Sequence, residues 1–123
     1  MNTDKAVIAV IDDEESVCKA LERLLRSAGL TANTFLNGAD FLSFLETNRP
    51  DCVVLDLNMM PMNGLEVLKS LAMKRLGLPV IIITGDDNEE KYQQVIDQGA
   101  AAYLLKPIDD QLLLDTIDTV LTH

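Results

Sequence analysis

The chain has few basic residues, and this shortage limits the partners that it can bind directly. Lysine and arginine together number 10, against 20 aspartates and glutamates, so the formal net charge at pH 7 is -10. Because affinity for nucleic acid comes largely from basic side chains that neutralise phosphates, this balance argues against direct binding to nucleic acid. It favours cations or basic protein surfaces as ligands.

Cysteines and long apolar runs are also scarce. The two cysteines, Cys18 and Cys52, lie far apart and both fall in apolar patterns, which predicts buried free thiols rather than a disulfide or a metal pair. Residues 1–5 have no basic stretch followed by a long apolar core, so we predict no signal peptide. No run approaches membrane-spanning length. We therefore expect a soluble, cytoplasmic protein without a membrane partner.

The sequence does contain enough apolar material for one core. It has 123 residues, of which 48% are hydrophobic. That length suits one compact domain, and that composition is too apolar for a disordered chain. No repeat, linker or low-complexity segment interrupts the pattern, so we predict a single domain over residues 1–123.

Short apolar runs alternate with helical patterns five times along the chain. The predicted strands cover residues 6–11, 30–35, 52–55, 79–83 and 102–105, and a predicted helix follows each of them. This alternation is typical of an α/β fold in which helices cover both faces of a parallel sheet. We predict a doubly wound, flavodoxin-like sheet of five parallel strands in the order 2-1-3-4-5, with the polar second strand at an edge.

The helices carry start signals, stop signals and apolar stripes. Gly29 is a predicted left-handed stop, and Asn37 and Asp109 are predicted N-caps. Asp87 with Glu90 three residues later resembles a capping box. The predicted core positions are Val17, Ala20, Leu21, Leu24, Leu25 and Ala28 in the first helix, Phe41, Leu42 and Leu45 in the second, Leu65, Leu68, Leu71 and Ala72 in the third, and Leu113, Leu114, Ile117, Val120 and Leu121 in the last.

Polar side chains stand where the predicted strands end. These are Asp12 and Asp13, Asp56, Thr84 and Lys106, while the second strand contributes nothing obvious. Right-handed crossovers place all parallel strand ends at one edge of the sheet, and the crevice opens between the first and third strands. We therefore expect the three carboxylates to converge there.

Such a cluster has a chemistry of its own. Like charges at close range resist joint ionisation, and a divalent cation with oxygen ligands relieves them. Mg²⁺ suits one to three carboxylates and bridges to phosphate oxygens, and the backbone carbonyl of Asn58 is a candidate further ligand. Lys106 and the Thr84 hydroxyl can each contact a phosphoryl oxygen. A carboxylate such as Asp56 can attack phosphorus and become an aspartyl phosphate.

With these parts in place, the sequence resembles the receiver domain of bacterial two-component response regulators, over essentially its whole length. The matching segments are VIDDEE at 10–15, VVLDLNM at 53–59, NG at 63–64, ITG at 83–85 and YLLKP at 103–107. Each is weak alone, and together in this order they are specific. One departure stands out. The family usually has proline directly after the equivalent of Met59, whereas here Met60 intervenes before Pro61.

The resemblance implies roles for individual residues. It makes Asp56 the phosphoacceptor, assigns Mg²⁺ to Asp12 and Asp13, and makes Lys106 the phosphate contact. It makes Thr84 and Tyr103 a switch pair, and it implies a cis peptide bond between Lys106 and Pro107.

The resemblance also implies a function and its partners. The expected function is a phosphorylation-controlled switch rather than an enzyme, catalysing only its own phosphoryl transfer and dephosphorylation. A histidine kinase or phosphotransfer protein would donate the phosphoryl group, and a downstream protein or output domain would recognise the result. We expect the output surface on the fourth helix, the fifth strand and the fifth helix, where Leu112 lies outside the core stripe.

Two other functions use similar residues. A metal-dependent phosphatase resembling the haloacid dehalogenase family would place its nucleophile after the first strand, with a second aspartate two residues later. Here the candidate follows the third strand, and Asn58 occupies the position of the general acid. A flavodoxin-like flavin binder would need a phosphate-binding loop after the first strand, where Asp12 and Asp13 would repel the phosphate.

Overall fold

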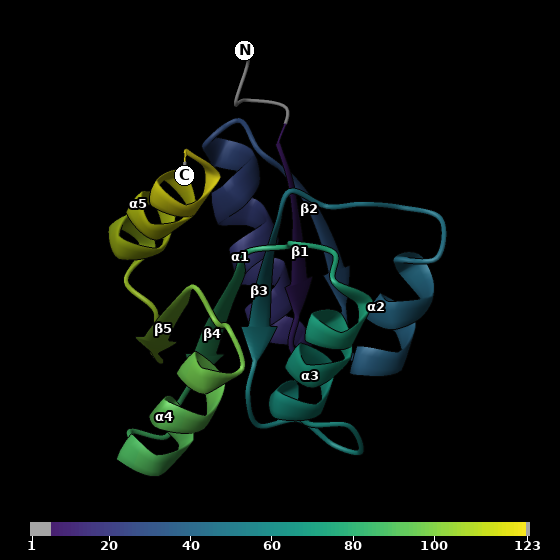
Figure 1. Cartoon of the computed structure of the whole chain (residues 1–123). Coiled ribbons are helices and arrows are strands. Elements are labelled where there is room, and N and C mark those ends of the chain that lie inside the picture. Colours follow the sequence, from purple (N-terminus) through teal and green to yellow (C-terminus); the bar gives the residue numbers. More distant parts are fainter. Residues whose placement is uncertain (1–5, 123) are drawn as a thin grey trace.

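The computed structural model describes residues 6–122, and a parallel sheet of five strands forms its centre (Figure 1). The strands are β1 (Val7–Ile11), β2 (Thr31–Phe35), β3 (Cys52–Asp56), β4 (Val80–Thr84) and β5 (Ala102–Leu105). The helices are α1 (Glu15–Ser27), α2 (Gly38–Phe44), α3 (Gly64–Lys74), α4 (Glu89–Asp97) and α5 (Asp110–Leu121). The strand order β2-β1-β3-β4-β5 confirms the predicted fold class, including the edge position of β2.

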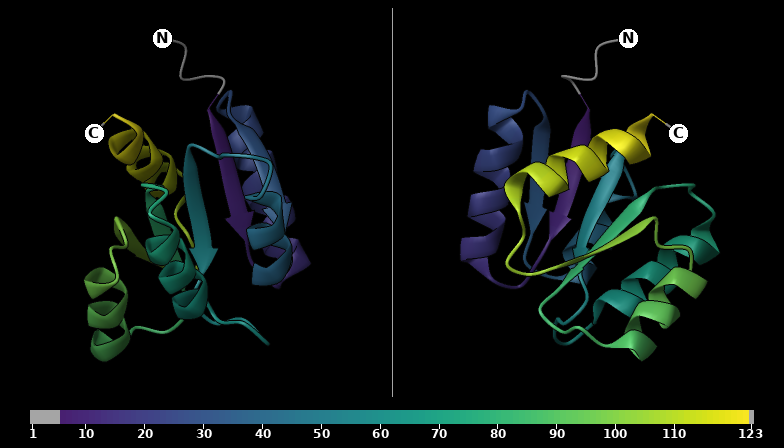
Figure 2. Two further views of the ribbon diagram at one scale, coloured as in Figure 1. Left: turned by 45° about the vertical axis from the view of Figure 1, so that its right-hand side comes forward. Right: turned by 90° about the vertical axis from the view of Figure 1, so that its left-hand side faces the viewer.

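Two apolar cores lie on opposite faces of the sheet. Because successive side chains of a strand point to opposite faces, Ile8 and Val10 enter one core while Ala9 and Ile11 enter the other. The first core packs against α1 and α5, and the second packs against α2, α3 and α4. Figure 2 shows the helices on both sides of the sheet. Burial on both faces explains why β1, β3 and β4 are continuous apolar runs.

Most of the predicted helix ends are confirmed. Gly29 has φ 83, the left-handed conformation that ends α1. Asn37 accepts a hydrogen bond from the Asp40 N–H at 2.8 Å, and Asp109 accepts one from the Leu112 N–H at 2.8 Å. These side chains satisfy backbone donors that have no partner within the helix.

The predicted cap of α4 is wrong by one residue. Asn88, not Asp87, is the N-cap, and its side chain accepts from the Lys91 N–H at 3.0 Å. The preceding loop explains the difference, because the Asn88 N–H donates to the Asp86 carbonyl at 3.0 Å and delays the first helical turn. The capping box predicted from Asp87 and Glu90 therefore does not form.

The core stripes are confirmed in outline and corrected at their margins. Ala20, Ala28 and Ala72 are exposed, because a methyl group at the margin of a stripe does not reach the sheet. Val67, which was not among the predicted core positions, is buried. In α2 only Phe41 of the three predicted apolar positions is fully buried, and Leu42 and Leu45 are half-buried. Leu65 of α3 and Leu114, Val120 and Leu121 of α5 are also half-buried.

Three smaller predictions can also be compared with the structure. Both cysteines are free and buried, and burial raises the pKa of Cys18 to about 11 and that of Cys52 to about 12. The Lys106–Pro107 peptide bond is cis as predicted, and the Met60–Pro61 bond is cis as well. Within residues 6–122, no helix combines the length and apolarity needed to cross a lipid bilayer.

Candidate functional site

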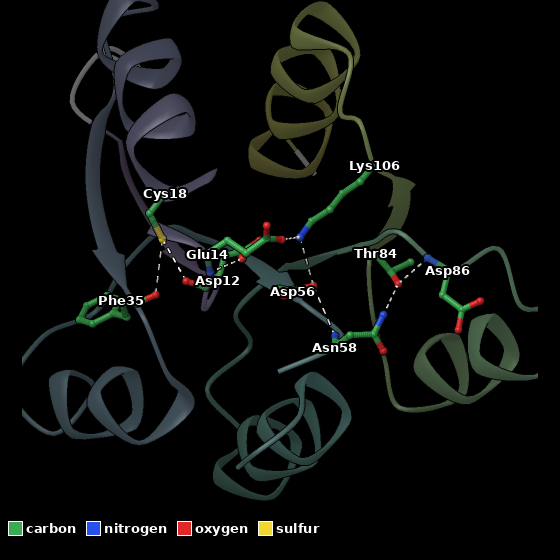
Figure 3. A network of polar contacts seen from close by, with 9 residues as sticks. All are labelled: Asp12, Glu14, Cys18, Phe35, Asp56, Asn58, Thr84, Asp86 and Lys106. Atoms are coloured by element: carbon green, nitrogen blue, oxygen red, sulfur yellow. Dashed lines mark hydrogen bonds and ion pairs between the residues drawn. The ribbon is translucent and has the colours of Figure 1, made fainter. Parts of the chain in front are cut away.

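The carboxyl ends of four strands place polar side chains at one edge of the sheet (Figure 3). β1 ends directly before Asp12, β3 ends at Asp56, and β4 ends at Thr84. β5 ends directly before Lys106. Asp12, Asp56 and Thr84 are at most 2% exposed, so these polar groups are taken out of water by the fold itself.

Three carboxylates converge at this edge. One oxygen each of Asp12, Asp13 and Asp56 lies within 4.8 Å of the others. Asp13 is exposed, so the cluster is open to solvent on one side. The predicted acidic cluster is therefore present. Because a buried charge needs a partner, the neighbours of these carboxylates determine what the site can do.

Lys106 supplies the positive charge of the cluster. Its Nζ lies 2.8 Å from Asp12 Oδ2, 3.4 Å from Glu14 Oε1 and 3.5 Å from Asp56 Oδ1. Burial on its own lowers the pKa of Lys106, but its bond to Asp12 and the charges of Asp56 and Glu14 outweigh that effect and raise it. The ammonium is thus held protonated between the carboxylates.

One lysine does not neutralise the cluster around Asp56. Burial, and after it the charge of Asp12, raises the pKa of Asp56 to about 6. The Lys106 ammonium and a hydrogen bond from the Asn58 N–H to Asp56 Oδ1 at 3.3 Å act in the opposite direction. The site therefore disfavours the ionised form of the carboxylate that lies at its centre.

The donor atoms present fit a hard divalent cation. Asp12 Oδ1 accepts from the Glu14 N–H at 2.9 Å, whereas the buried Oδ2 accepts no hydrogen bond from residues 6–122 and has only its ion pair with Lys106. A cation within this cluster would meet one oxygen ligand from each of three carboxylates, the donor set that Mg²⁺ and Ca²⁺ prefer. The acidic pocket is suited to binding a metal ion.

The backbone around Asp12 is supported from behind. The Cys18 thiol of α1 donates to the Asp12 carbonyl at 3.2 Å and to the Phe35 carbonyl at 3.7 Å (Figure 3). The Asp12 N–H in turn donates to the Phe35 carbonyl at 3.0 Å. These bonds tie α1 and the ends of β1 and β2 together directly beneath the carboxylate.

The loop after β3 is fixed by close packing of α3. A Cβ atom on Gly64 would collide with the Asp56 carbonyl oxygen and would lie 2.7 Å from Leu57 Cα, so only glycine lets α3 begin this close to the site. Asn63 and Glu66 then form a reciprocal capping box. In the loop itself Met59 is 3% exposed and Met60 is 80% exposed.

Thr84 is held between two neighbouring loops. Its hydroxyl oxygen accepts from the Asn58 side-chain amide at 2.9 Å and from the Asp86 N–H at 3.1 Å. The Tyr103 hydroxyl donates to the Asp86 carbonyl at 3.0 Å, and Lys91 pairs with the Asp86 carboxylate at 2.9 Å. Asp86 thus contacts both members of the predicted switch pair.

Tyr103 lies against the second core rather than in solvent. Its ring packs on that core and meets the Tyr92 ring edge-on, with centroids 5.1 Å apart. Burial is the first cause of its raised pKa. An inward turn of Tyr103 would therefore start from a ring that is already half-buried.

Sequence reasoning missed three contributors to the site. The Asn58 side chain, the Glu14 carboxylate and the backbone of Asp86 all contact predicted site residues. Glu14 carried a usable signal, since it follows Asp13 directly at the strand end. For Asn58 only the backbone carbonyl was considered, and nothing in the sequence shows where its amide points.

Comparison with known proteins identifies the family of this chain. The family model described as "Response regulator receiver domain" matches residues 8–118. The DNA-binding transcriptional regulator NtrC of Escherichia coli K12 is 36% identical over 119 residues, which are 97% of this chain and 25% of NtrC. This chain thus spans a quarter of that relative's length.

Solved structures agree with the sequence match. A response regulator receiver protein from Burkholderia phymatum is 41% identical with a TM-score of 0.84, and the match covers 96% of each chain. Chemotaxis protein CheY4 of Vibrio cholerae is 29% identical with a TM-score of 0.89, covering 94% of this chain and 98% of CheY4. Receiver domains are regulatory switches controlled by phosphorylation. With its family model, its relatives and its acidic crevice in agreement, the chain belongs to the response regulator receiver domain family.

Proposed function

We propose that Asp56 is the phosphoacceptor of this receiver domain and that the crevice works with Mg²⁺. The observation that carries the proposal is the convergence of Asp12, Asp13 and Asp56 around the ammonium of Lys106. Asp12, Asp13, Asp56 and the Asn58 carbonyl would hold the ion. When bound, Mg²⁺ would supply positive charge to the phosphoryl oxygens and to the carboxylates.

The chain's own residues then perform the transfer. An Asp56 carboxylate oxygen forms a bond to phosphorus while the P–N bond of a phosphohistidine donor breaks, and the imidazole keeps the electron pair and takes up a proton. Lys106, already 3.5 Å from Asp56, holds a phosphoryl oxygen, and the Thr84 hydroxyl donates to another. The same groups serve hydrolysis of the aspartyl phosphate, so we propose no catalysis beyond the phosphorylation and dephosphorylation of the domain itself.

The proposed partners are those of receiver domains in general, and the crevice offers one of them a place to approach. A histidine kinase or phosphotransfer protein would approach Asp56 beside Lys106, where a cavity of about 470 Å³ opens between α1 and the loop before α5. Its lining combines Val17, Leu21 and Ile108 with Lys106. We propose that residues 1–123 form one receiver domain and that it works in the cytoplasm. The downstream partner is a protein or an output domain, and DNA contact, as in NtrC, would belong to such a domain rather than to this one.

The proposed output surface is the face of α4, β5 and α5. Tyr92, Leu105 and Leu112 are exposed there, and Tyr103 connects it to the loop after Thr84. Phosphorylation adds negative charge and acceptor oxygens at Asp56. As Thr84 shifts toward them, the Asp86 backbone is pulled with it, and the Tyr103 hydroxyl and the first turn of α4 follow.

Mass spectrometry tests the assignment directly. Incubation with acetyl phosphate and Mg²⁺ should add one phosphoryl group, and EDTA should prevent the addition because the carboxylates then repel the donor. The Asp56→Asn protein should gain none, whereas the matched control Asp51→Asn should gain as much as wild type. Equal modification of the Asp56→Asn protein would refute the assignment.

A further inference from the structure

The Thr84 hydroxyl is fixed by hydrogen bonds from both sides. Asn58 reaches it from the loop after β3, and the Asp86 N–H reaches it from the loop after β4 (Figure 3). A hydroxyl has two acceptor lone pairs, and these two donors fill both. The oxygen is therefore placed by two loops rather than by the rotamer of Thr84 alone.

Water is kept from the Thr84 end of both bonds, although the bonds are only part-buried and Asn58 itself is exposed. Thr84 is 0% exposed, so its hydroxyl oxygen has no contact with bulk solvent. A buried polar group that loses a partner bears the full cost of its desolvation. Displacement of the Thr84 hydroxyl from Asn58 is therefore opposed, and a phosphoryl oxygen has to compensate for the lost bond.

Asn58 is also tied to the reacting carboxylate. Its backbone N–H donates to Asp56 Oδ1 at 3.3 Å, while its side chain donates to Thr84. One residue thus connects the proposed phosphoacceptor to the hydroxyl that has to approach the phosphoryl group. A shift of that hydroxyl toward Asp56 changes its distance to the Asn58 amide directly.

We propose that Asn58 is a positioning residue. Its side-chain amide holds the Thr84 hydroxyl in the position of the unphosphorylated state and sets how readily the domain changes to the activated arrangement. This role is separate from the metal contact proposed for the Asn58 backbone carbonyl. It rests on the proposed function, because it concerns the regulation of the same crevice. Loss of the amide should favour the activated arrangement.

The expected effect of removing the Asn58 amide follows from the loss of one hydrogen bond. A net contribution of about 1 kcal/mol, typical of one intramolecular hydrogen bond between neutral groups, changes a two-state ratio roughly fivefold. If the activated arrangement is a minor population, its increase lowers the apparent dissociation constant of any ligand that selects it by the same factor, again roughly fivefold.

Beryllium fluoride with Mg²⁺ is the probe, because it stands in for a phosphoryl group on a carboxylate. Amide NMR signals of the loop after Thr84 and of the start of α4 would be followed during its titration. The Asn58→Ala protein should respond at a roughly fivefold lower concentration than wild type. Before any probe is added, its signals should already be displaced toward the activated positions.

Asn63→Ala is the matched control. It removes an amide from the same loop, but the bonds of Asn63 are to Glu66 and cap α3. It should lower the unfolding temperature without moving the titration midpoint. A midpoint that moves equally in both variants would show a general loosening of the loop and would overturn the proposal.

A double-mutant cycle with Thr84→Val decides whether Asn58 acts through the hydroxyl. Valine keeps the shape of threonine without the oxygen, so Asn58→Ala should have no further effect on the resting signals in that background. An undiminished effect would contradict the proposal. If wild type itself fails to respond to the probe, the proposed function fails and the inference with it, whereas a normal wild-type response with an unchanged Asn58→Ala midpoint overturns the inference alone.

Discussion

The crevice and the face of α4, β5 and α5 depart from a well-folded surface in opposite ways. In the crevice, charged and polar groups are buried, with Asp12, Asp56 and Thr84 at most 2% exposed. On the face, apolar side chains are exposed, with Leu105 at 43% and Leu112 at 50%. Neither arrangement helps the chain to fold, since folding favours apolar burial and hydrated charge. In these two regions we expect function to explain what stability does not.

The regions also differ in how they are held. The crevice is fixed by backbone packing and by polar contacts to nearly every side chain, including the three ion pairs of Lys106. The face is held by the core behind it, while Leu112 itself lies outside the buried stripe of α5. Substitutions should therefore have large consequences in the crevice and small ones on the face.

The largest expected effect comes from adding one methyl group beneath the crevice. In Gly64→Ala the new Cβ meets the Asp56 carbonyl and Leu57 Cα, which are backbone atoms that cannot rotate away. We expect the free energy of unfolding to fall by about 3 kcal/mol, the upper end of typical overpacking costs. Urea denaturation measures it.

Gly85→Ala is the control for that substitution. It lies at the same edge of the sheet, yet a Cβ there meets nothing within 4 Å. It should change the free energy of unfolding by less than about 0.5 kcal/mol. Comparable losses in the two variants would mean that backbone flexibility, rather than close packing under Asp56, accounts for the glycine at 64.

Removal of the charge of Asp56 should have the opposite effect and should raise the free energy of unfolding. Its pKa is raised from 3.8 to about 6 by burial, so the folded protein holds this proton more tightly than the unfolded chain does. The resulting stabilisation is complete below pH 4 and is lost as the pH rises through 6. Without metal at pH 7.5, Asp56→Asn should therefore be more stable than wild type by about 2–3 kcal/mol.

The advantage of Asp56→Asn should disappear with acidification. Unfolding measured in EDTA at pH 7.5 and at pH 4 should show the two proteins converging at the lower pH. Asp118→Asn, on the exposed surface of α5, removes the same formal charge and separates the local effect from the overall charge of -10. If Asp118→Asn stabilises the protein equally at pH 7.5, repulsion over the whole molecule accounts for the gain.

The sequence predicted the features that depend on periodicity and on order along the chain. Apolar runs located the strands, and their alternation with helices predicted a parallel, doubly wound sheet, for which the flavodoxin-like strand order was assumed and is confirmed. Strand ends then brought Asp12, Asp56 and Lys106 to one edge, as the distances between them confirm. None of these conclusions needed the direction of a side chain.

The details that sequence reasoning missed depend on where side chains point in the folded protein. Asn58 was considered for its carbonyl, and only the folded loop places its amide on Thr84. Asn88 replaced Asp87 as the cap of α4 because the loop bonds around Asp86 set where the first turn begins. Val67 is buried although it was not among the predicted core positions of α3. Such choices are made by tertiary contacts that a one-dimensional pattern does not contain.

The smallest expected effect lies on the face, at Leu112. Its side chain is 50% exposed, so truncation to alanine leaves no internal cavity and reduces the apolar area in contact with water. Leu112→Ala should change the free energy of unfolding by less than about 0.5 kcal/mol. Leu113→Ala, one position along the same helix but 0% exposed, should cost about 3 kcal/mol.

Leu112→Ala can distinguish the role of the crevice from the role of the face of α4, β5 and α5. If the crevice performs the chemistry and the face only receives its result, the variant should take up the phosphoryl group from acetyl phosphate at the wild-type rate. Its amide signals in α4 and β5 should still respond to phosphorylation, because the contacts of Thr84, Asp86 and Tyr103 are intact. A changed uptake rate, or a lost response in α4, would mean that Leu112 belongs to the switch rather than to a contact surface beyond it.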